Sequence, residues 1–273
     1  MQNIIKALIV LTIILSLNSC DYFCDCDCED DNPIDTEENL SLEGLFVYYN
    51  FDSNSIDQSE NNLDCQPVGN YSYVSGIKGN AIFLDNPPNQ PFAHNAYVNL
   101  PEFNYSNDYT VSFHIKYNYS SAASTNHATY IWTAGAQVQS GNNNGYEYQL
   151  GFRTNAHTHE DLVLFGGNSE DVGFITDTEK RPSIKDAQWH HVLLRKSDNT
   201  IEFYFDNTLI EKVSIPSDLS FENYYESFLG KHQWIQGGSM NKADRYNGYI
   251  DEFFLFERAI IDDEIHDLFN LNY

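Results

Sequence analysis

Basic side chains are scarce in this chain. Its 273 residues include 14 lysines and arginines against 40 aspartates and glutamates, which gives a formal net charge of −26 at pH 7. Nucleic-acid binding depends on lysine and arginine contacts to phosphates. This balance therefore argues against a nucleic-acid partner and against flat docking on an anionic membrane. The same acidity suits solubility at a cell surface and the binding of divalent cations.

Membrane-spanning runs and leucine-rich helical repeats are also lacking. The apolar stretch Ala7–Leu17 is shorter than the roughly 20 residues that cross a bilayer. Aromatic residues are abundant instead, with 19 tyrosines and 18 phenylalanines. Because these side chains suit pleated, half-buried surfaces, the composition favours β structure.

The N-terminus has the pattern of an export signal. Lys6 supplies a positive charge before the apolar stretch, and Ser19 places a small residue before Cys20. The arrangement resembles a bacterial lipoprotein signal, which implies cleavage before Cys20 and lipidation of its thiol. The alternative is an ordinary signal peptide followed by an incidental cysteine. The predicted organisation is a signal peptide at 1–19, a lipidated acidic tether at 20–40 and a folded domain at 41–273.

Residues 21–39 hold nine acidic side chains and no basic one, so they repel one another and form an extended spacer. An acidic run after a lipidated cysteine is similar to the export signal of surface lipoproteins in Bacteroidetes-type bacteria. The resemblance implies the outer face of the outer membrane, reached through the lipid anchor alone.

Cysteine is sparse, with five in the chain. Cys24, Cys26 and Cys28 alternate with aspartates in the tether, and Cys65 lies in the domain. Without paired CxxC spacing this run does not make a convincing zinc site. A soft-metal site and disulfide pairing remain open alternatives to tether cysteines without a folded role.

Short strands separated by turns, about twelve of them, are predicted between Leu42 and Glu257. Alternation is clearest at residues 109–117 and 146–153. In the second stretch Glu147, Gln149 and Arg153 share one face and aromatic or apolar side chains share the other. A single helix is predicted at 262–269, with Asp262 as its N-cap. Short strands without intervening helices predict an antiparallel sandwich or barrel.

Four stretches resemble, in order, the laminin G-like domains of the concanavalin A-like superfamily. The leading segments of the four stretches are residues 44–52, 79–85, 189–192 and 247–253. The match as a whole spans residues 44–270. The resemblance implies an all-β, concanavalin A-like antiparallel jelly-roll sandwich with a short C-terminal helix. The first strand would pair with the last long strand, and Asp206-Asn207 would form a hairpin turn.

The resemblance also implies one structural calcium ion, where the end of the first strand meets the final strand. Asp52 and Asp251 are the matching positions, with Asp57 and the backbone around Asn54 as helpers. Carboxylate and carbonyl oxygens are the ligands that calcium prefers. The alternative is that these acids cap turns and accept backbone hydrogen bonds.

Sugar recognition requires exposed aromatic rings beside amide and carboxylate groups. Trp132, and Trp234 in the loop 231–247, are candidate platforms, and Glu147, Gln149 and Arg153 are a candidate polar groove. The alternatives are that the tryptophans belong to the core and that the polar residues form the wet side of a sheet.

Catalytic signatures are missing from the sequence. The laminarinase-type Glu-x-Asp-x-x-Glu, the nucleophile elbow, and the phosphate and dinucleotide loops are absent. His157 and His159 could hold zinc or copper, but a hydrated loop is the favoured interpretation. The prediction is a non-enzymatic surface module that binds a glycan or an extracellular protein. The alternatives are a polysaccharide hydrolase or lyase of the same fold, and a structural adhesin without glycan affinity.

Overall fold

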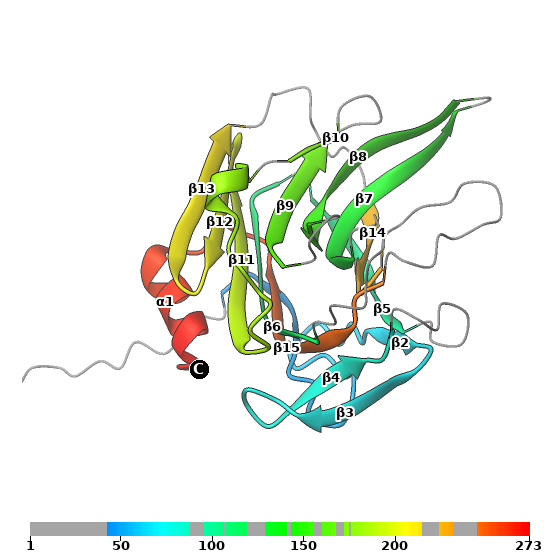
Figure 1. Ribbon diagram of the computed structural model, residues 1–273, viewed down its shortest axis with the longest axis vertical. Helices are drawn as coiled ribbons and strands as arrows, with labels where there is room; N and C mark the ends of the chain where they lie inside the picture. The colour runs from blue at the N-terminus through cyan, green and yellow to red at the C-terminus, as the bar shows by residue number, and fades with distance from the viewer. Residues whose placement is uncertain are drawn as a thin grey trace, which may run out of the picture. The chain divides into compact units, whose positions relative to one another are not determined.

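The computed structural model contains two antiparallel β-sheets and one C-terminal helix (Figure 1). Residues Glu38–Tyr273 form one compact unit with its own core, so this part can fold on its own. None of the helices in the described part of the chain is long and apolar enough to cross a membrane. The structure describes residues 43–87, 96–105, 107–118, 129–140, 143–155, 160–167, 172–174, 176–214, 224–231 and 245–273, without the side chains of 136–140, 143–149, 167, 172–174 and 224–226.

Sheet A has the strand order β13-β12-β11-β6-β15-β4-β3, with β1 paired to β15, and sheet B has the order β10-β9-β8-β7-β14-β5-β2. The strands of sheet A are β1 (Leu45–Tyr49), β3 (Tyr71–Ser75), β4 (Asn80–Leu84), β6 (Tyr109–Tyr117), β11 (Trp189–Ser197), β12 (Thr200–Phe205), β13 (Thr208–Ser214) and β15 (Gly248–Phe256). Those of sheet B are β2 (Gln66–Val68), β5 (Tyr97–Asn104), β7 (Tyr130–Ser140), β8 (Asn143–Thr154), β9 (Leu162–Gly167), β10 (Val172–Phe174) and β14 (Tyr224–Leu229). A 3-10 turn, η1 (Thr178–Lys180), and the helix α1 (Asp262–Asn270) complete the described elements.

The main core lies between the two sheets. Val111, Phe113 and Ile115 alternate along β6 and are fully buried, as the period of a strand requires. Phe113 contacts Phe152 of sheet B, with ring centroids 6.0 Å apart. The predicted antiparallel sandwich is therefore confirmed.

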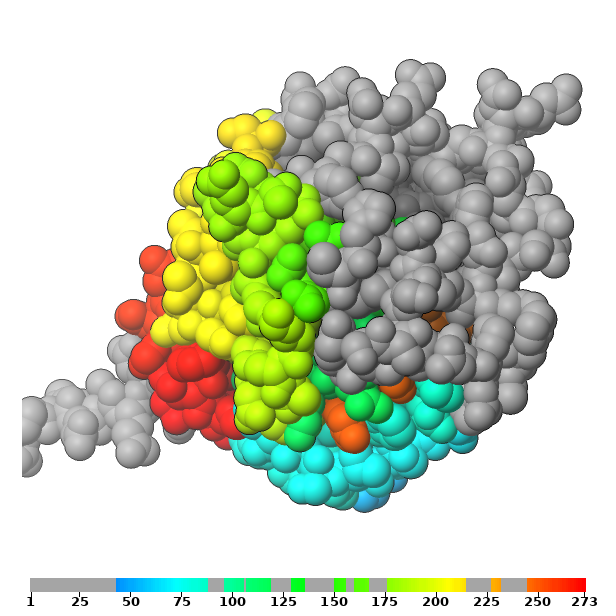
Figure 2. All heavy atoms as spheres, in the orientation of Figure 1, coloured from blue at the N-terminus to red at the C-terminus, as the bar shows by residue number. Residues whose placement is uncertain are grey.

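Part of the other face of sheet A is also buried, because α1 covers it. Ile265 and Leu268 of α1 join Leu193, Phe254 and other residues in a second, smaller apolar cluster. In Figure 1 and Figure 2, α1 lies on the side of the molecule that carries β12 and β13. Sheet A therefore carries apolar clusters on both of its faces.

The predicted helix is confirmed, but its N-cap is Ile261 rather than Asp262. The carboxylate of Glu264 accepts the backbone N–H of Ile261 at 2.8 Å. This bond satisfies one of the N–H groups that a helix leaves open in its first turn. Asp262 is therefore free to interact with sheet A.

β1 pairs with β15 as predicted, and Asp206-Asn207 forms the predicted hairpin turn with positive φ angles of 46° and 60°. The alternation of the sequence does not predict β2, β3 or β10. All three lie at sheet edges, and β2 contains Pro67, whose missing N–H is tolerated only there.

Candidate calcium site and candidate ligand-binding face

Two acidic side chains from opposite ends of the chain meet the turn between β3 and β4. Asp52, which follows β1, accepts the N–H of Asn80 at 2.6 Å. Asp251 of β15 accepts the N–H groups of Ile77 at 2.9 Å and Lys78 at 3.3 Å. Because β1 and β15 are paired, both carboxylates reach the same turn.

Two glycines allow the turn to lie this close. A Cβ atom at Gly76 would be 2.2 Å from Oδ2 of Asp251, and a Cβ atom at Gly79 would be 2.1 Å from Oδ1 of Asp52. Gly79 also has a φ of +65°, which favours glycine. Any other residue at either position would push the turn away from the acids.

The electrostatics of this corner disfavour an unneutralised charge. Asp251 is fully buried, and burial together with the charge of Glu252 raises its pKa to about 8, although backbone N–H groups act against this. Burial also raises the pKa of Glu252, whose carboxylate accepts the hydroxyl groups of Tyr48 at 2.6 Å and of Tyr273. Such a group of acids is favourable when a proton or a cation neutralises it.

Asp57 has a different role. Its carboxylate accepts the N–H of Tyr48 at 3.0 Å, the N–H of Leu63 at 2.9 Å, and both the N–H and the hydroxyl of Ser59 at 2.9 and 2.6 Å. These bonds tie the loop after β1 to its own strand. These bonds match the turn-capping alternative, and a calcium-binding role of Asp57 stays a prediction.

Within the described ranges, no three histidine, cysteine, aspartate or glutamate side chains are grouped so that they could hold a metal ion. A calcium ion between Asp52 and Asp251 would take its other ligands from backbone carbonyls or water, as calcium sites commonly do. The two acids and the glycine turn suit such an ion, and its presence stays a prediction.

The outer face of sheet B carries a group of aromatic and basic residues at one end of its strands. The group has five members, and each of them is half-buried. Arg245 lies beside the start of β7, where it forms an isolated β-bridge with Tyr130. We call this group the outer patch; its members are Tyr97 in β5, Tyr130 in β7, Arg153 in β8, Lys231 after β14, and Arg245.

Arg153 occupies one half of the outer patch. Its guanidinium carbon lies 5.8 Å from the ring centre of Tyr130 and 5.5 Å from that of Phe165. Phe165 can reach across β8 because Gly151 has no side chain; a Cβ atom there would lie 3.0 Å from Cε1 of Phe165 and 2.3 Å from a backbone oxygen of Trp132. The two rings contact each other edge to face at 5.4 Å.

Lys231 and Arg245 occupy the other half. The Nζ atom of Lys231 lies 3.9 Å from the ring centre of Tyr97 and 3.7 Å from that of Phe228. The guanidinium carbon of Arg245 lies 5.4 Å from the ring of Tyr97. Cation–π attraction of this kind is worth about 0.5–2 kcal/mol per pair, so the rings hold the cations in place.

The other predicted ligand-binding residues have different outcomes. Trp132 is fully buried against Tyr105 and Phe152, so the prediction that it offers its ring to a sugar is wrong. Glu147 and Gln149 lie in β8, but their side chains are outside the described part. Trp234, Cys20, His157 and His159 also lie outside the described residues.

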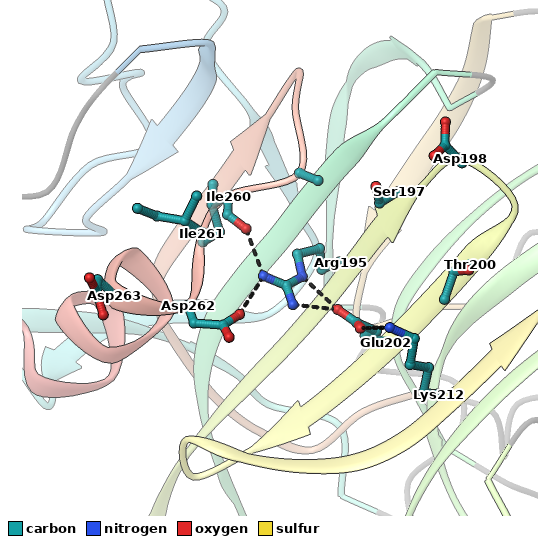
Figure 3. Close-up of a pocket in the computed structure, with 11 residues that line it drawn as sticks. Arg195, Ser197, Asp198, Thr200, Glu202, Lys212, Ile260, Ile261, Asp262 and Asp263 are labelled. Carbon is teal, nitrogen blue, oxygen red and sulfur yellow. Dashed lines mark hydrogen bonds and ion pairs between the residues drawn. The ribbon is translucent and has the colours of Figure 1, made fainter.

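A pocket of ≈ 590 Å³ lies on sheet A where β11, β12 and β13 meet the start of α1 (Figure 3). Arg195 donates to Oε2 of Glu202 at 2.6 Å, to the carbonyl of Ile260 at 2.8 Å and to Oδ1 of Asp262 at 2.7 Å. Lys212 donates to Oε1 of Glu202 at 2.7 Å. Burial favours the neutral form of Glu202, but the hydrogen bonds from Lys212 and Arg195 outweigh it and hold the pKa of Glu202 below its usual range.

This network of ion pairs connects the start of α1 to sheet A. It leads to a prediction about the free energy of unfolding. The change Arg195→Met leaves the carboxylate of Glu202, only 10% exposed, with Lys212 as its charge partner. We expect the free energy of unfolding, measured in urea, to fall by about 3 kcal/mol. Lys180→Met, in a pair with Glu211 whose lysine side chain is 50% exposed, should change it by less than about 1 kcal/mol. Equal effects of the two changes would contradict a stabilising network.

A family model described as the concanavalin A-like lectin/glucanases superfamily matches residues 92–266. The chain belongs to this superfamily. The matched segment runs from β5 to α1 and contains the whole outer patch. A search of curated proteins found no match.

Several solved structures share the fold of this superfamily member. Domain 4 of AbnA, a GH43 extracellular arabinanase from Geobacillus stearothermophilus solved with arabinotriose, is 20% identical with a TM-score of 0.57, over 82% of this chain and 97% of that one. The binding domain of botulinum neurotoxin serotype C1 is 15% identical with a TM-score of 0.61, over 85% and 52%. The binding domain of Paraclostridial Mosquitocidal Protein 1 is 17% identical with a TM-score of 0.58, over 84% and 52%. The chain thus spans about half the length of the two toxin domains, and at these identities the likeness shows the fold.

Proposed function

We propose that this protein is a glycan-binding module without catalytic activity, anchored in the outer membrane through a lipid on Cys20. The tether at 21–39 would hold the domain away from the membrane surface, because its acidic side chains repel one another. The export pattern of residues 6–20 supports the anchor.

The outer patch is the observation that carries the glycan assignment. Tyr97 and Tyr130 are half-buried rings of the kind on which sugar faces stack, and Arg153 and Lys231 lie beside them as hydrogen-bond donors. A domain of the same fold was solved with arabinotriose, which supports a saccharide as the ligand of this one.

Calcium would complete the proposal as a structural ion. Asp52 and Asp251 would hold it at the turn between β3 and β4, where it would neutralise buried acids and keep the turn in place. The ion would thus support the fold rather than contact the ligand.

A polysaccharide array with the domain 38–273, with and without calcium, tests the proposal. We expect binding to at least one polymer, which stays intact. Tyr130→Ala should lose at least about fivefold in affinity, taking as a guide the roughly 1–3 kcal/mol that a base gains by stacking on an aromatic ring. Tyr71→Ala, at an exposed tyrosine of sheet A, is the matched control and should bind normally.

The other outcomes identify the alternatives. A shortened polymer would show a hydrolase or lyase and overturn the non-catalytic assignment. A folded domain that binds no polymer would overturn the glycan assignment and direct the search to an extracellular protein ligand or an adhesin role.

A further inference from the structure

The outer patch concentrates basic side chains on a strongly acidic protein. The whole chain has 14 lysines and arginines against 40 acids, yet Arg153, Lys231 and Arg245 lie together on one face of sheet B. A protein of this net charge repels polyanions over most of its surface. A local group of basic side chains is the feature that could attract an anion to one place on such a protein.

The strand register explains how the group forms. Val98, Leu229, Trp132 and Phe152 are successive cross-strand partners in β5, β14, β7 and β8, and all four are buried. Tyr97 and Arg153 are the next residues along from Val98 and Phe152 and point to the opposite face. Tyr130 lies on the same face as Arg153 because a bulge between Tyr130 and Trp132 shifts the register, so that Tyr130 pairs with Arg153. Lys231 lies there because Gly230, with a φ of +84°, turns the chain after Leu229.

The patch is therefore a row and not a single point. Four neighbouring strands about 4.8 Å apart extend over about 14 Å, which is long enough for a short oligosaccharide. Each cation rests on a ring within this row, so its position is restricted before any ligand arrives and less conformational entropy is lost on binding.

The half-buried positions also strengthen the charges. Electrostatic attraction at a partly desolvated site is screened less by water and salt than at an exposed one. An arginine guanidinium matches the planar geometry of a carboxylate and also pairs well with other oxyanions, and a lysine acts as a point charge beside it.

We propose that the outer patch binds an anionic glycan, one whose sugar units carry carboxylate or sulfate groups. The rings of Tyr97 and Tyr130 contact the sugar faces, and Arg153, Lys231 and Arg245 pair with the acidic substituents. This proposal rests on the proposed function and names the ligand class of the same face.

Four polymers test the ligand class with the domain 38–273. Polygalacturonate carries carboxylates, heparin carries sulfates and carboxylates, and linear arabinan and dextran are neutral. We expect an acidic polymer to bind at least tenfold more tightly than either neutral one, and its affinity to fall at least tenfold between about 0.01 M and about 0.15 M salt, where screening sets in. The two acidic polymers distinguish a carboxylate from a sulfate requirement.

Charge-removing variants test whether the outer patch is the binding site. Arg153→Gln and Lys231→Gln should each weaken binding of the acidic polymer at least tenfold and reduce its salt dependence, and Arg153→Lys should bind between Arg153→Gln and the unaltered domain. Lys180→Gln changes the net charge by the same amount beside Glu211 of β13 in sheet A, and it should bind as the unaltered domain does. Circular dichroism confirms that each variant is folded.

Failure of the anionic ligand class, of the outer patch as the site, and of the proposed function would each give a different result. Neutral arabinan that binds as tightly as the acidic polymers, without salt dependence, would overturn the anionic ligand class while the proposed function stands. Acidic polymers that bind Arg153→Gln and Lys231→Gln unchanged would overturn the outer patch as their site. A folded domain that binds none of the four polymers would overturn the anionic ligand class, and silence on the wider array would remove the proposed function as well.

Discussion

Millimolar calcium is expected to raise the free energy of unfolding of the domain 38–273 by about 3 kcal/mol, the stabilisation that a ligand gives at roughly 100 times its dissociation constant. The reason is that the ion would neutralise two acids, Asp52 and Asp251, which meet one turn, and the second of these is fully buried. Urea unfolding in calcium and in EGTA measures the difference.

Two variants separate this site from a general effect of the ion. Asp251→Asn should lose the calcium response and be at least as stable as the unaltered domain in EGTA, because the buried charge is gone while an amide oxygen can still accept the N–H of Ile77. Asp57→Asn should be less stable but keep the full response, because Asp57 caps a turn. A calcium response that survives in Asp251→Asn, or that is missing in the unaltered domain, would remove this site.

Acid is expected to destabilise the domain through two buried histidines. His114 of β6 and His191 of β11 are register partners with ring centroids 4.8 Å apart, and both are covered on the face that carries α1. Burial lowers the pKa of His114 to about 4, and burial together with His114 lowers the pKa of His191 well below its usual range. In the folded state both rings are therefore neutral at physiological pH.

Whether acid raises or lowers the free energy of unfolding depends on which state, folded or unfolded, binds more protons. The unfolded chain protonates His114 as the pH falls through the ordinary histidine pKa of 6.5, whereas the folded chain does so only near a pKa of about 4. Stability from this group is complete above pH 6.5 and is lost as the pH falls to about 4. At about 1.4 kcal/mol per pKa unit, the loss is about 3 kcal/mol.

His114→Phe removes this contribution, together with the part of the lowered His191 pKa that His114 causes. Asp251 has a raised pKa and acts in the opposite direction, since acid neutralises its buried charge. It is present in both proteins, but as the register partner of His114 it adds to the difference whatever coupling the two groups have. Denaturant unfolding at a series of pH values should show the unaltered domain losing about 3 kcal/mol relative to His114→Phe on acidification. Parallel curves for the two proteins would show that His114 does not titrate differently on unfolding.

The sandwich was predictable because its longer strands repeat a clear period of two, as β6 does. The edge strands were not, because a strand with one neighbour and two exposed sides needs no such alternation; Tyr71–Ser75 is mostly exposed. Trp132 shows a different limit. A bulge lies between Tyr130 and Trp132, where the pairing with β8 shifts register, and the sequence does not reveal which face the tryptophan takes.

The two candidate sites also differ in how far the sequence predicts them. Asp52 and Asp251 could be predicted because they match the family pattern, Asp52 just after the first strand and Asp251 within the last long strand. The outer patch could not be found as a unit. The alternation of β8 predicts that Arg153 faces outward, but Tyr97, Lys231 and Arg245 join it only through the order of strands in sheet B, which no local pattern encodes.

The pairing of β1 with β15 has a mechanical consequence for an anchored protein. If the protein is anchored as proposed, a pull on a bound ligand would return to the membrane through residues 20–40, which precede β1 in the sequence. Among the described strands, β1 pairs with β15 alone, so this short ladder bears the load. Asp52 lies just past the far end of β1 and Asp251 lies in β15. A calcium ion between them would link the two strands at the far end of this ladder, where their separation would otherwise be completed.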